Sequence, residues 1–416
     1  MNLFNKIVFL FLLFGANSFS QDVYTLKDAL SYGKKHSPTL VSEQLEIEIS
    51  KSDLISAKLR PNFNFNFESI QIVDSKEYAL GTRWGNSQNR ETLWELSKPI
   101  QWFGQRKNQI GLAQESVKIE EQNYSDIERE ILFEIAEKWV EVWTLQMQQE
   151  LLETAKVNSD SLKYLNQKKF ENEVITHTDY LRIELMSKQF DMQYKKSKLL
   201  TEKSQIEFGN LLGKTDKIQA DGDLDFVISL VINDDSIFNN ATDYRADFQK
   251  LKTIETWSER NIKTQKSFAY PQPEIGVVWN HQTAVPFLGL SFSIDLPFFD
   301  RNQGEIKKSH IINEQIQHEL YFYKNKIESE VDIARSNYYL NKHNFEDYQP
   351  LLEQSEIILK NVRTAYLKGG TTVVDYLEAQ RSWLETQENY YETLQDYVES
   401  YLKLLYTVGL INQLAL

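Results

Sequence analysis

The feature that most constrains the fold of this chain is an internal repeat. Ile100–Phe103 resembles Leu296–Phe299, and Asp179–Leu181 resembles Asp375–Leu377, both at an offset of 196 residues. The offset holds over a long stretch without an insertion, which chance similarity does not explain. A period near 200 residues is also far longer than the repeats of solenoid proteins. The sequence therefore predicts two copies of one structural unit.

The repeat divides the chain into four predicted parts. Residues 1–20 read as a secretory signal peptide, because one lysine precedes a short apolar run that ends in small residues. The alternative for this run is a short anchor helix. Residues 21–213 and 242–416 are the two structural repeats, and residues 214–241 form a linker between them. We expect a short ordered piece of the linker around Phe226–Ile232.

Each repeat contains a predicted β-hairpin, in residues 62–98 and in residues 274–296, where polar and apolar residues alternate. Such a sheet either packs in a soluble sandwich or faces lipid in an outer-membrane barrel. Four strands cannot close a barrel, but three chains would supply about 12, above the practical minimum of about 8. The membrane interpretation therefore requires an oligomer. Its lipid-facing residues would be Phe63, Phe65, Phe67, Trp94, Leu288, Leu290, Phe292 and Ile294.

Each hairpin is followed by a long helical hairpin. No proline occurs between Trp102 and about Lys169, and a helix of about 65 residues would span roughly 100 Å. Apolar residues recur there at spacings of three and four, which indicates a coiled-coil-like seam. The reversals are predicted at residues 171–178 and 369–372. Because Glu173 stands where the second copy has glycine, we expect the two turns to differ in detail.

Composition excludes several classes of function. The 416 residues contain no Cys, and 60 Asp+Glu against 46 Lys+Arg give a net charge of −14. Disulfides, thiol catalysis and thiolate zinc sites are thereby removed, and an acidic chain is a poor partner for nucleic acid. The 6 His include no pair at helical spacing, and no catalytic or phosphate-binding motif is present. We expect no enzyme activity, no cofactor and no resident metal.

Three segments give the chain a resemblance to a known family, the TolC-like outer-membrane efflux proteins. Leu26–Leu40 and Tyr244–Phe248 resemble the helix openings of that family's two repeats. Tyr366–Ala379 resembles the turn at the periplasmic tip. Leu296–Ile306 resembles the strand-to-helix junction of the CzcC-like branch, which serves heavy-metal efflux. The resemblance covers essentially the whole mature chain.

The resemblance implies a mainly α-helical fold with a small β part. Long helical hairpins would form a trimeric α-barrel, and four strands per chain would join one shared outer-membrane β-barrel. The homotrimer would be the exit duct of a tripartite efflux system in a Gram-negative outer membrane, extending into the periplasm. Its partners would be a periplasmic adaptor, an inner-membrane pump and outer-membrane lipid, and its cargo heavy-metal cations. Alternatives are a duct for drugs, small molecules or type I secretion, and, in another class, a periplasmic coiled-coil scaffold without a pore.

The resemblance also implies a gate at the tip. Asp375 and Glu378 lie one helical turn apart, so in a trimer they would form carboxylate rings that favour cations. The alternative is that they are helix-start charges that complement the dipole. Thr178 and Asp179 resemble the neighbouring tip pair of the first copy.

Two further tip residues follow from the same resemblance. Tyr366, which falls on Phe170 at the offset of 196, resembles the aromatic residue of the closed-state hydrogen-bond network. Gly369 permits the tight reversal between helices. Thr371 stands where well-known members of the family have a locking Arg, so we expect a different lock, with Arg182 as the candidate.

Overall fold

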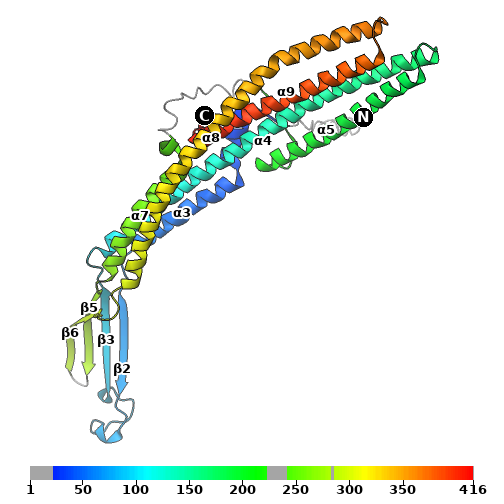
Figure 1. The fold of residues 1–416 in the computed structure, drawn as a ribbon. Coiled ribbons are helices and arrows are strands. Elements are labelled where there is room, and N and C mark those ends of the chain that lie inside the picture. Colours follow the sequence, from blue (N-terminus) through cyan, green and yellow to red (C-terminus); the bar gives the residue numbers. More distant parts are fainter. Residues whose placement is uncertain (1–21, 223–240, 283–284, 416) are drawn as a thin grey trace, which may run out of the picture. The chain divides into compact units, whose positions relative to one another are not determined.

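The computed structural model describes residues 22–222, 241–282 and 285–415 (Figure 1). The predicted signal peptide, residues 1–20, and the predicted ordered piece around Phe226–Ile232 lie outside the described residues.

The described residues form two compact units. The helical unit comprises those within Met1–Ser42, Asp126–Arg245 and Lys326–Leu416. The sheet unit comprises those within Glu43–Ser125 and Ala246–Asn325. Each unit draws on both sequence repeats, so the repeats interleave in space and do not form one unit each.

The sheet unit contains one four-stranded antiparallel sheet, to which each repeat contributes one hairpin, as the alternation predicted. Its strands are β2 (Asn64–Gln71), β3 (Arg90–Pro99), β5 (Pro273–Gln282) and β6 (Val285–Ile294), in the order β2-β3-β5-β6. The central pairing of β3 with β5 joins the two repeats. Figure 1 shows the four strands side by side.

The register of the sheet sorts its side chains into an apolar and a polar face. Phe67, Trp94, Trp279 and Leu288 stand in one row across all four strands. The rings of Phe67 and Trp94 lie 4.4 Å apart, and those of Trp94 and Trp279 lie 6.4 Å apart. The residues predicted to face lipid are Phe63, Phe65, Phe67, Trp94, Leu288, Leu290, Phe292 and Ile294. All of them are exposed except Ile294, which is half-buried. Phe63 immediately precedes β2.

The opposite face of the sheet carries a hydrogen-bonded polar network. Asn64 Nδ2 and Ser97 Oγ each donate to Glu274 Oε1 at 2.6 Å. Asn280 Nδ2 donates to Glu91 Oε1, also at 2.6 Å. Both faces are therefore specified by the sequence, because a register shift of one residue would exchange them.

Long helices make up the rest of the fold. The sheet unit includes most of α3 (Pro38–Lys58), all of α7 (Ala246–Phe268), and the first parts of α4 (Gln105–Glu171) and α8 (Gln303–Leu367). In the described part of the chain, no helix combines the length and apolarity needed to cross a membrane.

The described part of the helical unit contains the remaining parts of α4 and α8 and several shorter elements. These are α2 (Leu26–His36), α5 (His177–Leu211), α9 (Val373–Val408), η4 (Ile411–Ala415) and a parallel pair of strands, β1 (Asp22–Tyr24) with β4 (Ile218–Ala220). Strand β4 lies in the segment predicted as linker, where the sequence analysis did not anticipate it.

The core of the helical unit lies where α2, α4, α5 and α9 meet. The predicted seam of α4 is buried there, with Ile135 and Val142 at 0% and Trp139 at 1% exposure. Trp139 Nε1 donates to the backbone oxygen of Tyr24 at 2.8 Å. The N–H group of this large buried side chain therefore has a hydrogen-bond acceptor. A Cβ on Gly33 would lie 2.2 Å from Ile135 Cδ1, so any larger residue there would have to displace the end of this side chain.

Candidate functional site at the hairpin turns

The two helical hairpins, α4–α5 and α8–α9, reverse through turns that end on a threonine cap. Thr176 Oγ1 accepts from the backbone N–H of Asp179 at 3.1 Å, and Thr372 Oγ1 accepts from that of Asp375 at 3.2 Å. Each threonine hydroxyl also donates to the carboxylate of the same aspartate. This arrangement satisfies N–H groups of the first turn and explains where α5 and α9 begin. The exposed Thr178 lies in the first turn of α5.

The two turns share one backbone geometry at the reversal but differ in their caps, because in the second turn the Asp375 carboxylate also accepts from the backbone N–H of Thr372, at 3.1 Å. Glu173 has φ 58 and Gly369 has φ 77, both in the left-handed region. The N–H of the next residue, Val174 or Gly370, donates to the carbonyl five residues earlier at 2.8 Å in both turns. This helix-terminating geometry favours glycine. A non-glycine residue adopts it at a cost of about 1–2 kcal/mol, which the first hairpin tolerates.

Equivalent aromatic pairs flank the two turns but differ in burial. Phe170 stacks on Tyr180 with centroids 5.5 Å apart, and Tyr366 stacks on Tyr376 at 5.3 Å. Phe170 is 36% exposed, whereas Tyr366 is 7% exposed. The hydroxyl of Tyr366 donates to Asn166 Oδ1 at 2.6 Å. Burial raises the pKa of Tyr366, so this hydroxyl keeps its proton and remains a donor. Tyr366 thus ties the second hairpin to α4 of the first.

The predicted gate carboxylates have different surroundings. The hydroxyls of Thr371 and Thr372 donate to Asp375 Oδ2 at 2.6 and 2.7 Å. These hydrogen bonds hold the pKa of Asp375 below its usual range, so the carboxylate is ionised. Glu378, one turn along α9, pairs with Arg381 at 3.9 Å, and both side chains are largely exposed. Asp375 therefore has the capping role named as the alternative, and a role of both acids in a pore stays a prediction.

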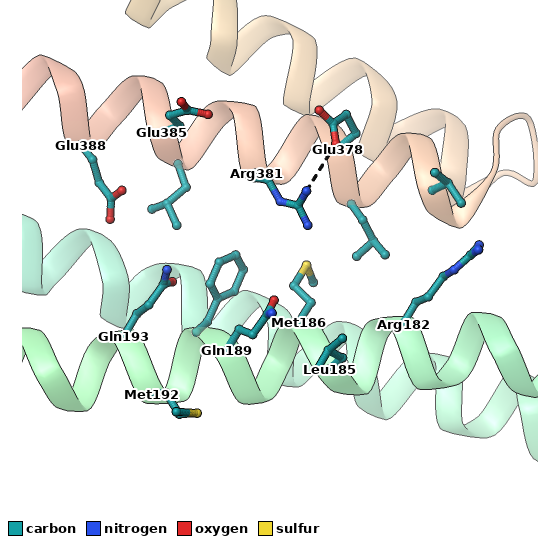
Figure 2. A pocket seen from close by; sticks show the side chains of 14 residues that line it. Arg182, Leu185, Met186, Gln189, Met192, Gln193, Glu378, Arg381, Glu385 and Glu388 are labelled. Carbon is teal, nitrogen blue, oxygen red and sulfur yellow. Dashed lines mark ion pairs between the residues drawn. The ribbon is translucent and has the colours of Figure 1, made fainter.

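A groove of about 870 Å³ lies between α5 and α9, beside the turns (Figure 2). Arg182 of α5 and Arg381 of α9 line it, with Leu185 and Met186 supplying apolar surface. The groove's acids are Glu378, Glu385 and Glu388. Its lining therefore combines apolar surface with charges of both signs.

Arg182, the predicted lock, lies in this groove. Its guanidinium pairs with Asp179 Oδ1 at 3.7 Å, within its own helix. The hydroxyl of Tyr366 is held by the neutral amide of Asn166 instead. The link seen in the structure is therefore an uncharged hydrogen bond between helices, which sequence reasoning missed. A weak signal was available, because Asn166 is a polar residue one helical turn after the buried Leu162, on the buried face of α4.

The described residues contain no group of three or more His, Cys, Asp or Glu side chains that could hold a metal ion.

Comparisons with known proteins give matches at the level of structure. No family model matches this sequence, and no curated protein does. A membrane protein from Pseudomonas aeruginosa is similar with a TM-score of 0.76 and 13% identity, over 94% of this chain and 92% of that chain.

Two further similar structures are outer-membrane channels. The open state of MtrE from Neisseria gonorrhoeae has a TM-score of 0.74 at 13% identity, over 92% of this chain and 89% of that chain. CmeC from Campylobacter jejuni has a TM-score of 0.72 at 14% identity, over 95% of this chain and 90% of that chain. At such low identity the likeness establishes the fold, and this chain has the mainly helical fold, with a small antiparallel sheet, of TolC-like outer-membrane channels.

Proposed function

We propose that this chain is one subunit of a homotrimeric exit duct in the outer membrane. The observation that carries the proposal is the sheet, whose apolar face is exposed while its polar face is hydrogen-bonded. In the strand order of the sheet, β2 and β6 are the two edge strands, and each pairs with one neighbouring strand. Pairing β2 of one copy with β6 of the next would remove these edges, and three copies would supply about 12 strands, enough for a barrel with lipid outside and water inside. The similarity to outer-membrane channels supports this arrangement.

In this proposal the hairpin turns form the periplasmic end of the duct. Asp375 and Glu378 would ring its mouth and raise the local concentration of cations. Thr178, Asp179, Tyr366 and Gly369 would shape the same end. The groove between α5 and α9 offers a docking surface for a periplasmic adaptor, which would connect the duct to an inner-membrane pump.

The tip assignment is tested by ion selectivity. In the double variant Asp375→Asn/Glu378→Gln, we expect the reversal potential across a salt gradient to shift toward that of a non-selective pore. A matched control on the same helix is Glu392→Gln/Asp396→Asn, which removes the same charge farther along α9. A reversal potential that is unchanged in the first variant, or shifted equally in both, would remove Asp375 and Glu378 from the gate.

We propose heavy-metal cations as the cargo. The support is the junction sequence Leu296–Ile306 and its resemblance to the metal-efflux branch. A duct also has no need of a tight metal site, because it must release what it carries. Drugs, other small molecules and type I secretion substrates are the alternatives for the same duct.

The function is tested by deleting the gene and measuring tolerance to zinc, cobalt, cadmium, copper and a drug panel. Sensitivity to metals alone supports the proposed cargo, and sensitivity to drugs alone selects the alternative. In parallel, the purified protein should run as a detergent-stable trimer. A stable monomer that forms no pore would favour the coiled-coil scaffold.

A further inference from the structure

The junction between strands and helices in the sheet unit carries exposed aromatic side chains. We call them the aromatic collar; exposed fractions are 36% for Trp102, 57% for Phe103, 49% for Tyr270, 70% for Phe298 and 96% for Phe299. They come from the three connections β3–α4, α7–β5 and β6–α8. Phe103 and Tyr270 stack with centroids 4.3 Å apart. Clustered exposed aromatic residues of this kind are typical of the level where a membrane meets water.

The distance between the aromatic collar and the row that contains Trp94 and Trp279 matches the thickness of a membrane's apolar band. Trp94, in the row that contains Trp279, precedes Trp102 by eight residues. At about 3.3 Å per extended residue this is about 26 Å, or about 20 Å for a strand tilted by about 40°. The apolar band of outer-membrane proteins is about 25 Å tall and has aromatic residues at both edges. In a membrane-embedded sheet the collar would therefore lie at the helical edge of this band.

The sequence around the collar is basic in an otherwise acidic chain. Residues 98–107, 260–270 and 295–308 together contain nine Lys or Arg and three Asp or Glu, whereas the whole chain has 46 against 60. Basic residues beside an aromatic belt match the negative surface of a membrane that contains anionic lipid.

A small pocket concentrates this charge beside the collar. It measures about 230 Å³ and is lined by Lys107, Asn108, Thr256, Glu259, Arg260 and Lys263. The lining includes three cations and one carboxylate, and a second carboxylate, Glu115, pairs with Arg260 behind the wall. In the described part of the chain, Lys107 and Lys263 are exposed and form no ion pair.

The walls of the pocket are fixed by contacts between α4 and α7. Asn108 Nδ2 donates to the backbone oxygen of Lys263 at 3.3 Å. Arg260 Nε pairs with Glu115 Oε1 at 3.1 Å. A Cβ on Gly111 would lie 2.7 Å from Arg260 Nη1, so glycine makes room for the guanidinium. The site is therefore a shaped pocket, with two free ammonium groups at its rim.

The depth of the pocket matches the lipid headgroups. Lys263 precedes Tyr270 of the collar by seven residues, which corresponds to about 10 Å along a helix. A headgroup layer extends about 5–8 Å beyond the hydrocarbon core. A long lysine side chain reaches back over the remaining distance, as such side chains do at membrane surfaces.

We propose that this pocket binds the phosphate of an anionic phospholipid in the periplasmic leaflet, while the aromatic collar lies at the boundary between headgroups and acyl chains. The proposal rests on the outer-membrane location given under the proposed function. Lys107 and Lys263 supply the charge, Arg260 lines the inner wall, and Asn108 holds the two helices in register.

The test uses the full chain, purified in detergent and exposed to phosphatidylglycerol or phosphatidylcholine. Lipid retained per protein is measured by mass spectrometry of the intact protein. We expect the wild type to prefer phosphatidylglycerol and Lys107→Gln/Lys263→Gln to lose affinity by about 10- to 30-fold, at the ~1 kcal/mol typical of each basic residue near an anionic surface. Arg260 is left intact, because its loss would leave the buried Glu115 with Lys118 as its remaining cationic partner.

The control is Lys196→Gln/Lys198→Gln, two exposed lysines of α5, which removes the same charge from the helical unit. Equal retention of phosphatidylglycerol by all three chains, or no preference in the wild type, would overturn the proposal. Conductance of the same proteins in vesicles is scored separately. If none of the chains conducts, the duct fails, and lipid retention in detergent still decides the pocket.

Discussion

The two hairpin turns share one backbone and differ in what their aromatic residues hold. Each has a left-handed residue, Glu173 or Gly369, followed by a threonine cap on the next helix. In the first turn, Phe170 is partly exposed and has no polar atom with which to bind another helix. In the second, Tyr366 is buried and bound to Asn166. The two turns therefore share their backbone, and the hydroxyl of Tyr366 ties the second hairpin to α4.

The largest expected difference between the turns is in the aromatic pairs. Tyr366→Ala should destabilise the second turn by about 3–5 kcal/mol, because it removes a buried ring. Phe170→Ala should cost about 1 kcal/mol, since this ring is partly in water already. Limited proteolysis under native conditions measures local opening and should detect cleavage near residues 368–372 in the first variant. Equal cleavage in both variants would contradict the assigned difference.

The left-handed residues should respond in opposite directions. Glu173→Gly should stabilise the first turn by up to about 1 kcal/mol, because it relieves the strain of a left-handed non-glycine residue. Gly369→Ala should destabilise the second turn by about as much. Amide hydrogen exchange in the turns measures both changes. The same sign in both variants would show that the turns are not backbone equivalents.

The smallest effect concerns pH at the second turn. The pKa of Asp375 is lowered, so its stabilising contribution is present above its ordinary value of 3.8 and is lost as the pH falls through the lower folded value. We expect acid to increase proteolytic opening of the second turn in the wild type. The Asp375→Asn variant should lack this part of the pH dependence. An identical acid profile in both proteins would remove Asp375 as its source.

Much of the fold could be predicted because it depends on local patterns. Alternation indicated the strands, and spacings of three and four indicated the buried seam that includes Ile135 and Trp139. The constant offset of 196 placed equivalent landmarks of both halves correctly.

The sequence was less informative where geometry overrides residue type. Glycine is the expected residue at a left-handed position, so Glu173 suggested a different turn, although the hairpin tolerates the strain. The bond between Asn166 and Tyr366 joins residues 200 positions apart, and no local pattern indicates such a pair. Strand β4 is only three residues long and is specified by its pairing with β1, which local sequence does not reveal.

The central proposal is an outer-membrane duct in which the bond between Tyr366 and Asn166 helps to hold the periplasmic end shut, as the resemblance implies for Tyr366, and single-channel recording in planar bilayers tests it most directly. We expect discrete channels of low conductance from the trimeric wild type. We expect a higher conductance or open probability for Tyr366→Phe, which leaves the buried Asn166 Oδ1 without its donor. Folded trimers that give no channels in either protein would contradict the account.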